Sequence, residues 1–306
     1  MKKYLIFSIR ILLGGTFLLS ACLKLFPIEP FELNFIDLGI ANWITAPFIA
    51  RLLIGTEFFL GVLLLFGLAL KKFTLPATFI LVALFSTYIL FQLFTSGNKG
   101  DCGCFGTYLQ MTPLQSLIKN VILVSLAVLL YLISEVKRIR FQNALIIFFA
   151  VAALSLPLLL NPIDLMAGKV RQPEEINFPL PITLITGEST KNDTIDLMKG
   201  KHIISFISLT CPHCKVAAFK MHVMKKRHPE IPFYFILNGK ENKLQDFYDA
   251  TKADNIDYMF LFGKNFYTLT GGNLPTIYWV DNGMVVKKSM YISLEEKEIL
   301  QWLGEQ

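Results

Sequence analysis

The chain has 306 residues, of which 54% are hydrophobic and 17% are charged, and its formal net charge at pH 7 is +6. Soluble proteins carry about 25% charged residues on average, so the composition excludes a disordered chain, a fibrous repeat and an ordinary soluble enzyme. Most of the net positive charge lies in residues 1–165, which hold 12 Lys and Arg against 7 Asp and Glu. We interpret this charge as a signal of membrane topology and not of nucleic-acid binding.

Five apolar segments in the first half are long enough to cross the roughly 30 Å hydrocarbon core of a membrane. They lie at residues 4–26, 46–70, 74–95, 114–134 and 141–160. Basic residues gather at one end of these segments, at Lys2, Lys3, Lys71, Lys72, Lys137, Arg138 and Arg140, whereas the loops at the other end are mainly acidic. The positive-inside rule therefore predicts a multi-pass protein of the cell (inner) membrane, with a cytoplasmic N-terminus and with everything after the fifth span on the outer, periplasmic face.

The first span contains a sequence that also fits a lipoprotein cleavage box, Leu19-Ser20-Ala21-Cys22. Arg10 interrupts its apolar run, which the core of a signal peptide seldom allows, so we expect the segment to remain as a span. Cys22 is then either a small apolar packing residue or a resolving thiol near the outer end of this span.

The loop between the third and fourth spans carries the sequence Asp101-Cys102-Gly103-Cys104-Phe105-Gly106. A disulfide between Cys102 and Cys104 would close a tight ring, and strained disulfides are the more oxidising ones. The loop is predicted on the same face of the membrane as the second half of the chain, so this pair could exchange with thiols there. A simple loop staple and a metal-binding pair are the alternatives.

Three ionisable residues lie inside the predicted spans, Arg10, Arg51 and Glu57. Such residues are costly in hydrocarbon and are usually paired or functional. At about 1.5 Å of rise per residue, Glu57 lies near the midplane of the membrane. We expect either a structural ion pair, with Arg10 as a partner, or a proton or quinone role for Glu57. Arg51 lies nearer the outer surface, where its side chain could snorkel.

The first half resembles the DoxX/MauE family of redox-associated membrane proteins. The resemblance is carried by Ser20-Ala21-Cys22-Leu23-Lys24, by the stretch from Ala50 to Glu57 and by Cys102-Gly103-Cys104-Phe105-Gly106. It implies a four-helix membrane domain at residues 1–138, followed by a fifth span and a linker at residues 139–174. It also implies a role in thiol–disulfide chemistry, with a quinone as the membrane partner and without a covalently bound cofactor.

The second half alternates β-rich apolar runs with amphipathic helical ones. We predict strands at residues 202–209, 231–237, 275–280 and 284–288, and helices at residues 212–227, 243–252 and 293–303. Ser293 is the expected cap of the last helix, with Glu296 three residues on. Asp281-Asn282-Gly283 is a hairpin turn signal. The order mixes a parallel crossover with an antiparallel hairpin, so residues 175–306 are predicted to form an α/β domain.

The sequence Cys211-Pro212-His213-Cys214 follows the first of these strands and opens a helix. The free N–H groups and the dipole of a helix N-terminus stabilise a thiolate, and the spacing lets the two thiols close a disulfide within one turn. Pro212 suits the first turn, and His213 can add positive charge beside the thiolate. A structural disulfide and a zinc site are the alternatives. Closed zinc sites need four ligands at set spacings, and we expect His222 and His228 to face solvent, so no metal is predicted.

Together with Leu274-Pro275-Thr276, this motif resembles the thioredoxin-like superfamily over about residues 175–306. The resemblance implies that Cys211 is the attacking thiol, that Cys214 is the resolving thiol and that Pro275 is a cis-proline that shapes the substrate groove. Cys-Pro-His-Cys is similar to the motif of the DsbA oxidants, whereas residues 177–182 and Gly200-Lys201 look more like the TlpA branch. Oxidation is therefore the favoured direction of electron flow, and outward delivery of reductant is the alternative.

The whole sequence predicts a multi-domain membrane protein, an α-helical bundle joined to a thioredoxin-like α/β domain. Its expected function is thiol–disulfide exchange. Cys211 and Cys214 would act on envelope proteins that carry cysteine pairs, and Cys102 and Cys104 would relay electrons to or from a quinone. Membrane lipid is the other expected partner, and no nucleic acid is expected. A maturation factor that uses the thioredoxin-like fold for docking and a transporter of a small sulfur compound are the alternatives from other classes.

Overall fold

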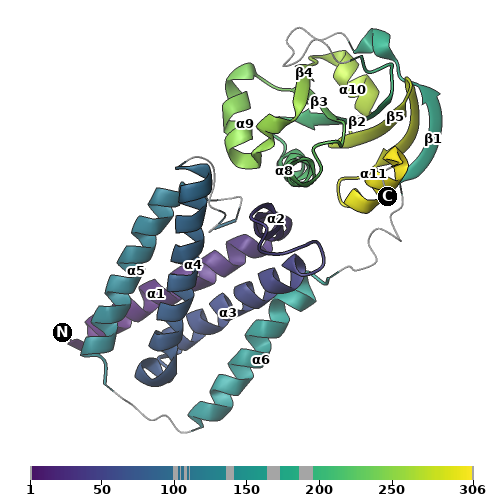
Figure 1. Ribbon diagram of the computed structural model, residues 1–306. Coiled ribbons are helices and arrows are strands. Elements are labelled where there is room, and N and C mark those ends of the chain that lie inside the picture. The colour runs from purple at the N-terminus through teal and green to yellow at the C-terminus, as the bar shows by residue number, and fades with distance from the viewer. Residues whose placement is uncertain are drawn as a thin grey trace. The chain divides into compact units, whose positions relative to one another are not determined.

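The computed structural model describes residues 2–98, 103, 105–106, 109, 111–135, 141–163, 173–185 and 196–304. The chain divides into two compact units, Met1–Ile163 and Asp164–Gln306. Figure 1 shows a bundle of helices in the first unit and a sheet flanked by helices in the second. Cys102 and Cys104 lie outside the described residues.

Long apolar helices build the first unit. They are α1 (Lys2–Leu25), α2 (Glu29–Asp37), α3 (Ala46–Phe66), α4 (Leu75–Ser96), α5 (Pro113–Ile133) and α6 (Gln142–Leu160), and a π-helical turn, η1 (Leu70–Thr74), leads into α4. Five of them are long and apolar enough to cross a membrane, which confirms that the five predicted segments are long apolar helices. The short helix α2 was not predicted, because nine residues in an acidic segment give no clear helical period.

Small residues let the helices of this unit pack closely. α3 packs against both α1 and α6. A Cβ atom added to Gly14 would lie 2.8 Å from the carbonyl oxygen of Gly61, and one added to Gly55 would lie 3.0 Å from the Cα atom of Leu154. Close backbone contact of this kind is typical of helix interfaces in membranes. α6, which the sequence groups with the linker, is packed along α3 as part of the first unit.

A six-stranded mixed sheet forms the second unit, in the order β1-β6-β5-β2-β3-β4. The strands are β1 (Glu174–Pro179), β2 (Lys201–Ser208), β3 (Phe233–Asn238), β4 (Asp257–Phe260), β5 (Thr276–Asp281) and β6 (Met284–Ser289). β2 runs parallel to β3 and antiparallel to β5, and β5 forms the predicted hairpin with β6. The two strands that were not predicted, β1 and β4, are the edges of the sheet. Their residues are less buried, so their sequence pattern is weaker.

Helices cover both faces of this sheet (Figure 1). They are α8 (Pro212–Arg227), α9 (Leu244–Thr251), α10 (Lys264–Thr270) and α11 (Glu296–Leu303), with 3-10 turns η2 (Ile182–Leu184), η3 (Glu241–Lys243) and η4 (Ala253–Asn255). Successive residues of β2 point to opposite faces. Phe206 packs against Phe266 of α10, whereas the Ser205 hydroxyl lies 3.3 Å from the sulfur of Met221 in α8. α8 and α10 therefore lie on opposite faces, and the arrangement is the predicted α/β domain with a mixed sheet.

The last helix begins later than predicted. Glu295, and not Ser293, occupies the N-cap of α11, with an extended backbone (φ −113°, ψ 131°). The Ser293 hydroxyl instead donates to the carbonyl oxygen of Met290, at 3.1 Å. The residues before α11 therefore form a turn of their own, which the capping pattern in the sequence does not reveal.

Candidate functional site

Cys211 occupies the N-cap position of α8, just beyond the end of β2. Its backbone is extended (φ −76°, ψ 124°), and Pro212 fills the first helical turn. The N–H of Cys211 donates to the carbonyl oxygen of Ser208 at 3.2 Å, and the carbonyl oxygen of Cys211 accepts from the N–H of Lys215 at 3.1 Å. The residue therefore adjoins the free N–H groups of the first helical turn.

Cys214 lies one turn into α8 and is fully buried, with 0% of its surface exposed, whereas Cys211 is half-buried. The backbone N–H of Ser208 donates to the Cys214 sulfur at 3.4 Å. Burial raises the pKa of the Cys214 thiol, and the Ser208 N–H opposes this increase only in part. The two thiols thus differ as disulfide exchange requires: one is accessible to a partner, and the other is protonated and shielded.

Pro275 lies at the same end of the sheet as Cys211. It directly precedes β5, whose first residue, Thr276, pairs with Phe206 near the carboxyl end of β2. The Leu274–Pro275 peptide bond is cis. The register of β5 on β2 therefore brings Pro275 and the cysteine motif to one edge of the sheet, although they are far apart in the sequence.

His213 is exposed in the first turn of α8, and its Nδ1 atom lies 3.3 Å from the hydroxyl of Tyr291. Tyr291 belongs to the segment between β6 and α11. Lys220 of α8 holds this segment in place, because its ammonium group donates to the carbonyl oxygens of Tyr291 and Ile292, at 2.9 and 3.3 Å. Met290 and Ile292 are exposed there, so apolar surface adjoins the motif. Tyr291 and Lys220 were not predicted, because they belong to no motif and only the fold brings them to His213.

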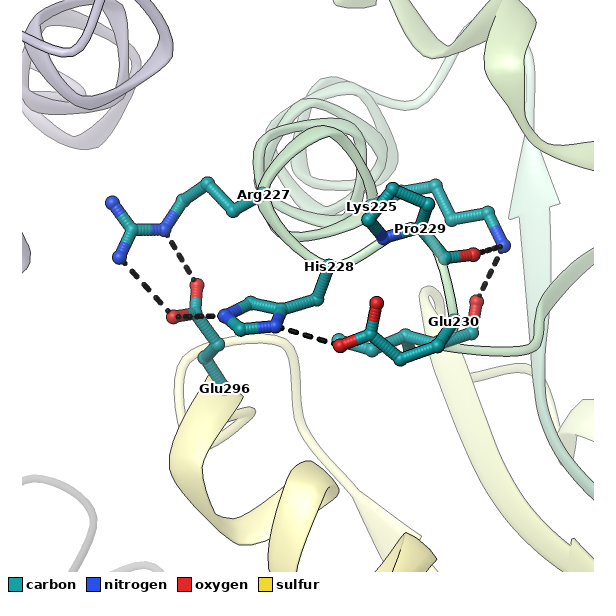
Figure 2. Close-up of polar contacts among 7 residues, drawn as sticks. Lys225, Arg227, His228, Pro229, Glu230 and Glu296 are labelled. Atoms are coloured by element: carbon teal, nitrogen blue, oxygen red, sulfur yellow. Dashed lines mark hydrogen bonds and ion pairs between the residues drawn. The ribbon is translucent and has the colours of Figure 1, made fainter. Parts of the chain in front are cut away.

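Hydrogen bonds and ion pairs connect the other end of α8 to α11 (Figure 2). Arg227 donates to both carboxylate oxygens of Glu296, at 3.0 and 3.3 Å. His228 lies between two carboxylates, 2.8 Å from Glu230 and 3.2 Å from Glu296. These contacts anchor the helix that carries both cysteines at the end remote from the thiols.

His222 was expected to face solvent, but the structure shows that it is buried. Its Nδ1 atom lies 3.0 Å from the side-chain oxygen of Asn255. Within the part of the chain that the structure describes, no group of three His, Cys, Asp or Glu side chains could hold a metal ion. The described geometry at the Cys211 motif is a pair of thiols within one helical turn.

In the first unit, Glu57 is buried in a polar cluster between α1 and α3. Its carboxylate lies 2.5 Å from the Lys24 ammonium, and the Ser20 hydroxyl donates to the two carboxylate oxygens at 3.3 and 3.4 Å. The side chains of Lys24 and Glu57 are only 2% and 3% exposed. The ring centres of Phe31 and Phe85 lie 5.0 and 4.6 Å from Lys24 Nζ. The cluster is a desolvated ion pair held among aromatic side chains.

Arg10, the partner expected for Glu57, contacts main-chain groups instead. It donates to the carbonyl oxygens of Leu64, at 3.0 Å, and Leu65, near the end of α3. About two turns of α3 separate these carbonyl groups from Glu57, so one arginine does not reach both. The expected Arg10–Glu57 pair is therefore wrong, and Arg10 instead satisfies the last carbonyl groups of α3.

Lys24 was not predicted as the partner of Glu57. The signal that could have identified it is its spacing from Ser20, because residues four apart share one face of a helix. Arg51 also differs from expectation. It is 6% exposed and does not snorkel, and its guanidinium lies 2.5 Å from the carboxylate of Glu32 in α2.

Phe105 and Gly106, in the loop between α4 and α5, pack at the same end of the bundle as Lys24. Phe105 is 5% exposed, and Lys119 Nζ lies 4.2 Å from its ring centre. A Cβ atom added to Gly106 would collide with the carbonyl oxygen of Leu23, the neighbour of Lys24. The two cysteines of this loop lie outside the described residues, and their neighbours in the sequence are close to the Lys24 end of α1.

Two solved structures are similar to part of this chain. One is the thioredoxin domain of a thiol-disulfide oxidoreductase from Bacteroides vulgatus, at 13% identity and a TM-score of 0.30, over 35% of this chain and 82% of that one. The other is a secreted disulfide oxidoreductase of Mycobacterium tuberculosis, at 12% identity and a TM-score of 0.32, over 40% of this chain and 98% of that one.

A family model and a bacterial protein are also similar to this sequence. The family model described as Methylamine utilisation protein MauE matches residues 2–133, which span α1 to α5. Protein TlpB of Flavobacterium psychrophilum is 28% identical over 343 aligned residues, which cover 94% of this chain and 91% of that protein. Residues 2–133 of the chain are therefore similar to the MauE family, and the chain is similar to Protein TlpB over most of its length.

Proposed function

We propose that the protein is a membrane-anchored thiol–disulfide oxidoreductase that acts through Cys211 and Cys214. The observation that carries the proposal is the unequal placement of these two thiols on α8. Cys211 is half-buried at the helix N-terminus, and Cys214 is fully buried one turn later. A structural staple needs no such asymmetry. Pro275, at the same edge of the sheet, would shape the groove in which a substrate segment lies.

In the reducing direction, the exchange begins at the Cys211 thiolate. The Cys211 thiolate attacks one sulfur of a substrate disulfide, and the other substrate sulfur leaves as a thiolate and takes up a proton. Cys214 then loses its proton and attacks the Cys211 sulfur, which releases the second substrate thiol and leaves a Cys211–Cys214 disulfide. Two electrons pass to the substrate, and oxidation is the same sequence reversed. His213, exposed beside the motif, would add positive charge near the thiolate.

The second cysteine pair, Cys102 and Cys104, would reset the first. In the oxidising direction, which the Cys-Pro-His-Cys sequence favours, a Cys102–Cys104 disulfide takes two electrons from reduced Cys211 and Cys214 by the same exchange. Tethering in one chain gives effective concentrations of about millimolar, so the transfer needs no strong contact between the units. In the reducing direction, the same relay would run outward.

A quinone is the membrane carrier that we propose, with the cluster around Glu57 as its site. Lys24 and Ser20 offer hydrogen-bond donors of the kind that a quinone oxygen accepts from, and the rings of Phe31 and Phe85 flank Lys24. A bound quinone supplies a two-electron acceptor within the membrane. Glu57 would hold a proton on its carboxylate, and Lys24 would balance the charge of the deprotonated form. A purely structural ion pair is the competing interpretation of this cluster.

The positive-inside pattern supports an orientation in which the thioredoxin-like unit and the loop of Cys102 and Cys104 face the periplasm. The five apolar helices and the MauE domain indicate a membrane protein, and the inner membrane is the location that we propose. Disulfides persist in that outer compartment. The proposed partners are envelope proteins that carry cysteine pairs.

Purified full-length protein in detergent tests the thiol assignments. A model peptide with one disulfide is added to the reduced protein, and the products are separated without reductant. Cys211→Ser should abolish exchange, whereas Cys214→Ser should accumulate a mixed disulfide through Cys211 that the wild type resolves. Cys22→Ser is the matched control, because Cys22 is exposed on α1 and enters no proposed step. Exchange that survives Cys211→Ser would contradict the proposal and favour the docking platform.

A further inference from the structure

A cavity of about 1140 Å³ lies at the end of the helical bundle remote from Lys24. It is formed by the start of α1, the end of α3, η1, the end of α5 and the start of α6. Its described lining includes five basic side chains, Lys2, Lys3, Arg10, Lys71 and Lys72, and one acidic one, Glu135. Lys2 lies 3.1 Å from Glu135. The lining therefore has a clear excess of positive charge, which would favour an anion.

A buried polar atom in this lining points to a ligand. Ser134 is 4% exposed, and among the described residues its hydroxyl has no hydrogen-bond partner. The side-chain oxygen of Gln142, also in the lining, is buried and unpartnered in the same way. Buried polar groups in native proteins nearly always have a partner, because leaving one unsatisfied is destabilising. Ser134 lies in the cavity wall, and a change of its side-chain rotamer would turn the hydroxyl toward a ligand that supplies the partner.

Two further features make the cavity suitable for an anion. The first three residues of α6 line it, and Phe141 at the N-cap provides no side-chain cap. Free N–H groups and the helix dipole at such a terminus favour negative charge. The guanidinium of Arg10 is also seated closely over Gly67, where an added Cβ atom would lie 2.5 Å from Arg10 Cζ. The glycine therefore makes room for this cation at the cavity wall.

The remaining lining is apolar and includes Ile6, Phe7, Phe66 and Leu70. A small inorganic anion gains nothing from such a wall, whereas an acyl chain does. We propose that the cavity binds the phosphate group of an anionic phospholipid, with the Ser134 hydroxyl donating to a phosphate oxygen. The acyl chains would lie along the apolar wall. Basic pockets between membrane helices are suited to such headgroups. Inorganic phosphate presents the same oxygens and is the other source of this chemistry.

Short-chain phosphatidylglycerol added to the full-length protein in detergent tests the proposal. Binding is followed by the shift in unfolding temperature and by lipid retained in native mass spectrometry. Ser134→Ala should bind the lipid about tenfold more weakly, which is the loss expected for one hydrogen bond to a charged group. Ser125→Ala makes the same change at an exposed position of α5 and should bind like the wild type. Without lipid, Ser134→Ala should unfold at the wild-type temperature or higher, because it removes an unsatisfied group.

Phosphatidylcholine and inorganic phosphate serve as comparison ligands, which distinguish a phospholipid site from a site for free phosphate. Stabilisation by phosphatidylglycerol alone, weakened in Ser134→Ala and at high salt, supports a lipid site. Equal stabilisation by inorganic phosphate would overturn the lipid assignment and leave a site for a free anion. Equal lipid binding by wild type, Ser134→Ala and Ser125→Ala would overturn the site itself. The double variant Lys71→Gln/Lys72→Gln should also bind more weakly, and unchanged binding there would count against an electrostatic site.

Discussion

The two units differ in how their buried reactive groups are stabilised. In the second unit, Cys214 is buried as a neutral thiol, while Cys211 stays accessible at a helix N-terminus. In the first unit, Glu57 and Lys24 are buried together as an ion pair. A thiol can be buried alone because it can keep its proton, whereas a carboxylate in hydrocarbon needs a counter-charge. Reactivity is therefore set by unequal exposure in one unit and by pairing in the other.

The largest expected effect comes from breaking the pair. Lys24→Met leaves the Glu57 carboxyl group buried without its counter-charge, and it should lower the free energy of unfolding by about 3–5 kcal/mol. Thermal unfolding of the purified protein in detergent measures the loss. The double variant Lys24→Met/Glu57→Leu removes both charges and should regain most of the stability.

The double variant also separates the two interpretations of this cluster. A stable double variant that keeps the redox coupling of Cys211 and Cys214 would make the pair structural. A stable double variant that loses the coupling would support the proton or quinone role of Glu57. Equal destabilisation by the single and double variants would contradict the view that pairing is what keeps these groups buried.

A smaller effect is expected where α1 and α3 cross. This crossing holds Ser20 and Lys24 against Glu57. Gly14→Ala would place a methyl group 2.8 Å from the Gly61 carbonyl oxygen, and overpacking of this kind costs about 1–3 kcal/mol. Gly15→Ala is the matched control, because nothing lies within 4 Å of its added Cβ atom. Equal unfolding temperatures of the two variants would show that the close crossing is not required.

The smallest effect concerns the pH dependence of the reduced second unit. Burial raises the pKa of Cys214 in the folded state above the value of about 8.5 that an unfolded cysteine has. Below that pH both states are protonated and stability is unaffected. At higher pH the unfolded state loses its proton first, so stability should fall by up to about 1.4 kcal/mol per pH unit.

Denaturant unfolding followed by tryptophan fluorescence checks this dependence, because Trp279 is fully buried in the second unit. Reduced wild type and Cys214→Ser share every other titrating group, so the difference in their slopes above pH 9 isolates Cys214. Parallel curves would mean that the Cys214 thiol is not shielded in the way its burial indicates.

Local signals made much of the fold predictable. Five long apolar runs correspond to α1, α3, α4, α5 and α6, because hydrocarbon thickness sets their length. Cys211 at a helix start was predictable because strand, Pro and helix follow one another directly in the sequence. The edge strands β1 and β4 were not, because a half-exposed edge lacks a continuous apolar pattern.

Tertiary contacts account for what the sequence did not reveal about the sites. Lys24 and Glu57 lie on different helices, and only the crossing of α1 and α3 selects Lys24 over Arg10 as the partner. Tyr291 meets His213 through the turn before α11, and no motif marks either residue for the other. The identity of residues predicts such partners only when the fold that brings them together is known.

Thiol trapping in intact cells tests the central claim most directly. An alkylating mass tag reports the redox state of Cys211 and Cys214 in wild type, Cys102→Ser and Cys104→Ser. We expect the pair to be oxidised in the wild type and to become reduced in both variants, because the membrane cysteines would be its oxidant. A pair that is reduced in the wild type and becomes oxidised would reverse the direction of electron flow. An unchanged redox state in both variants would contradict coupling between the two units.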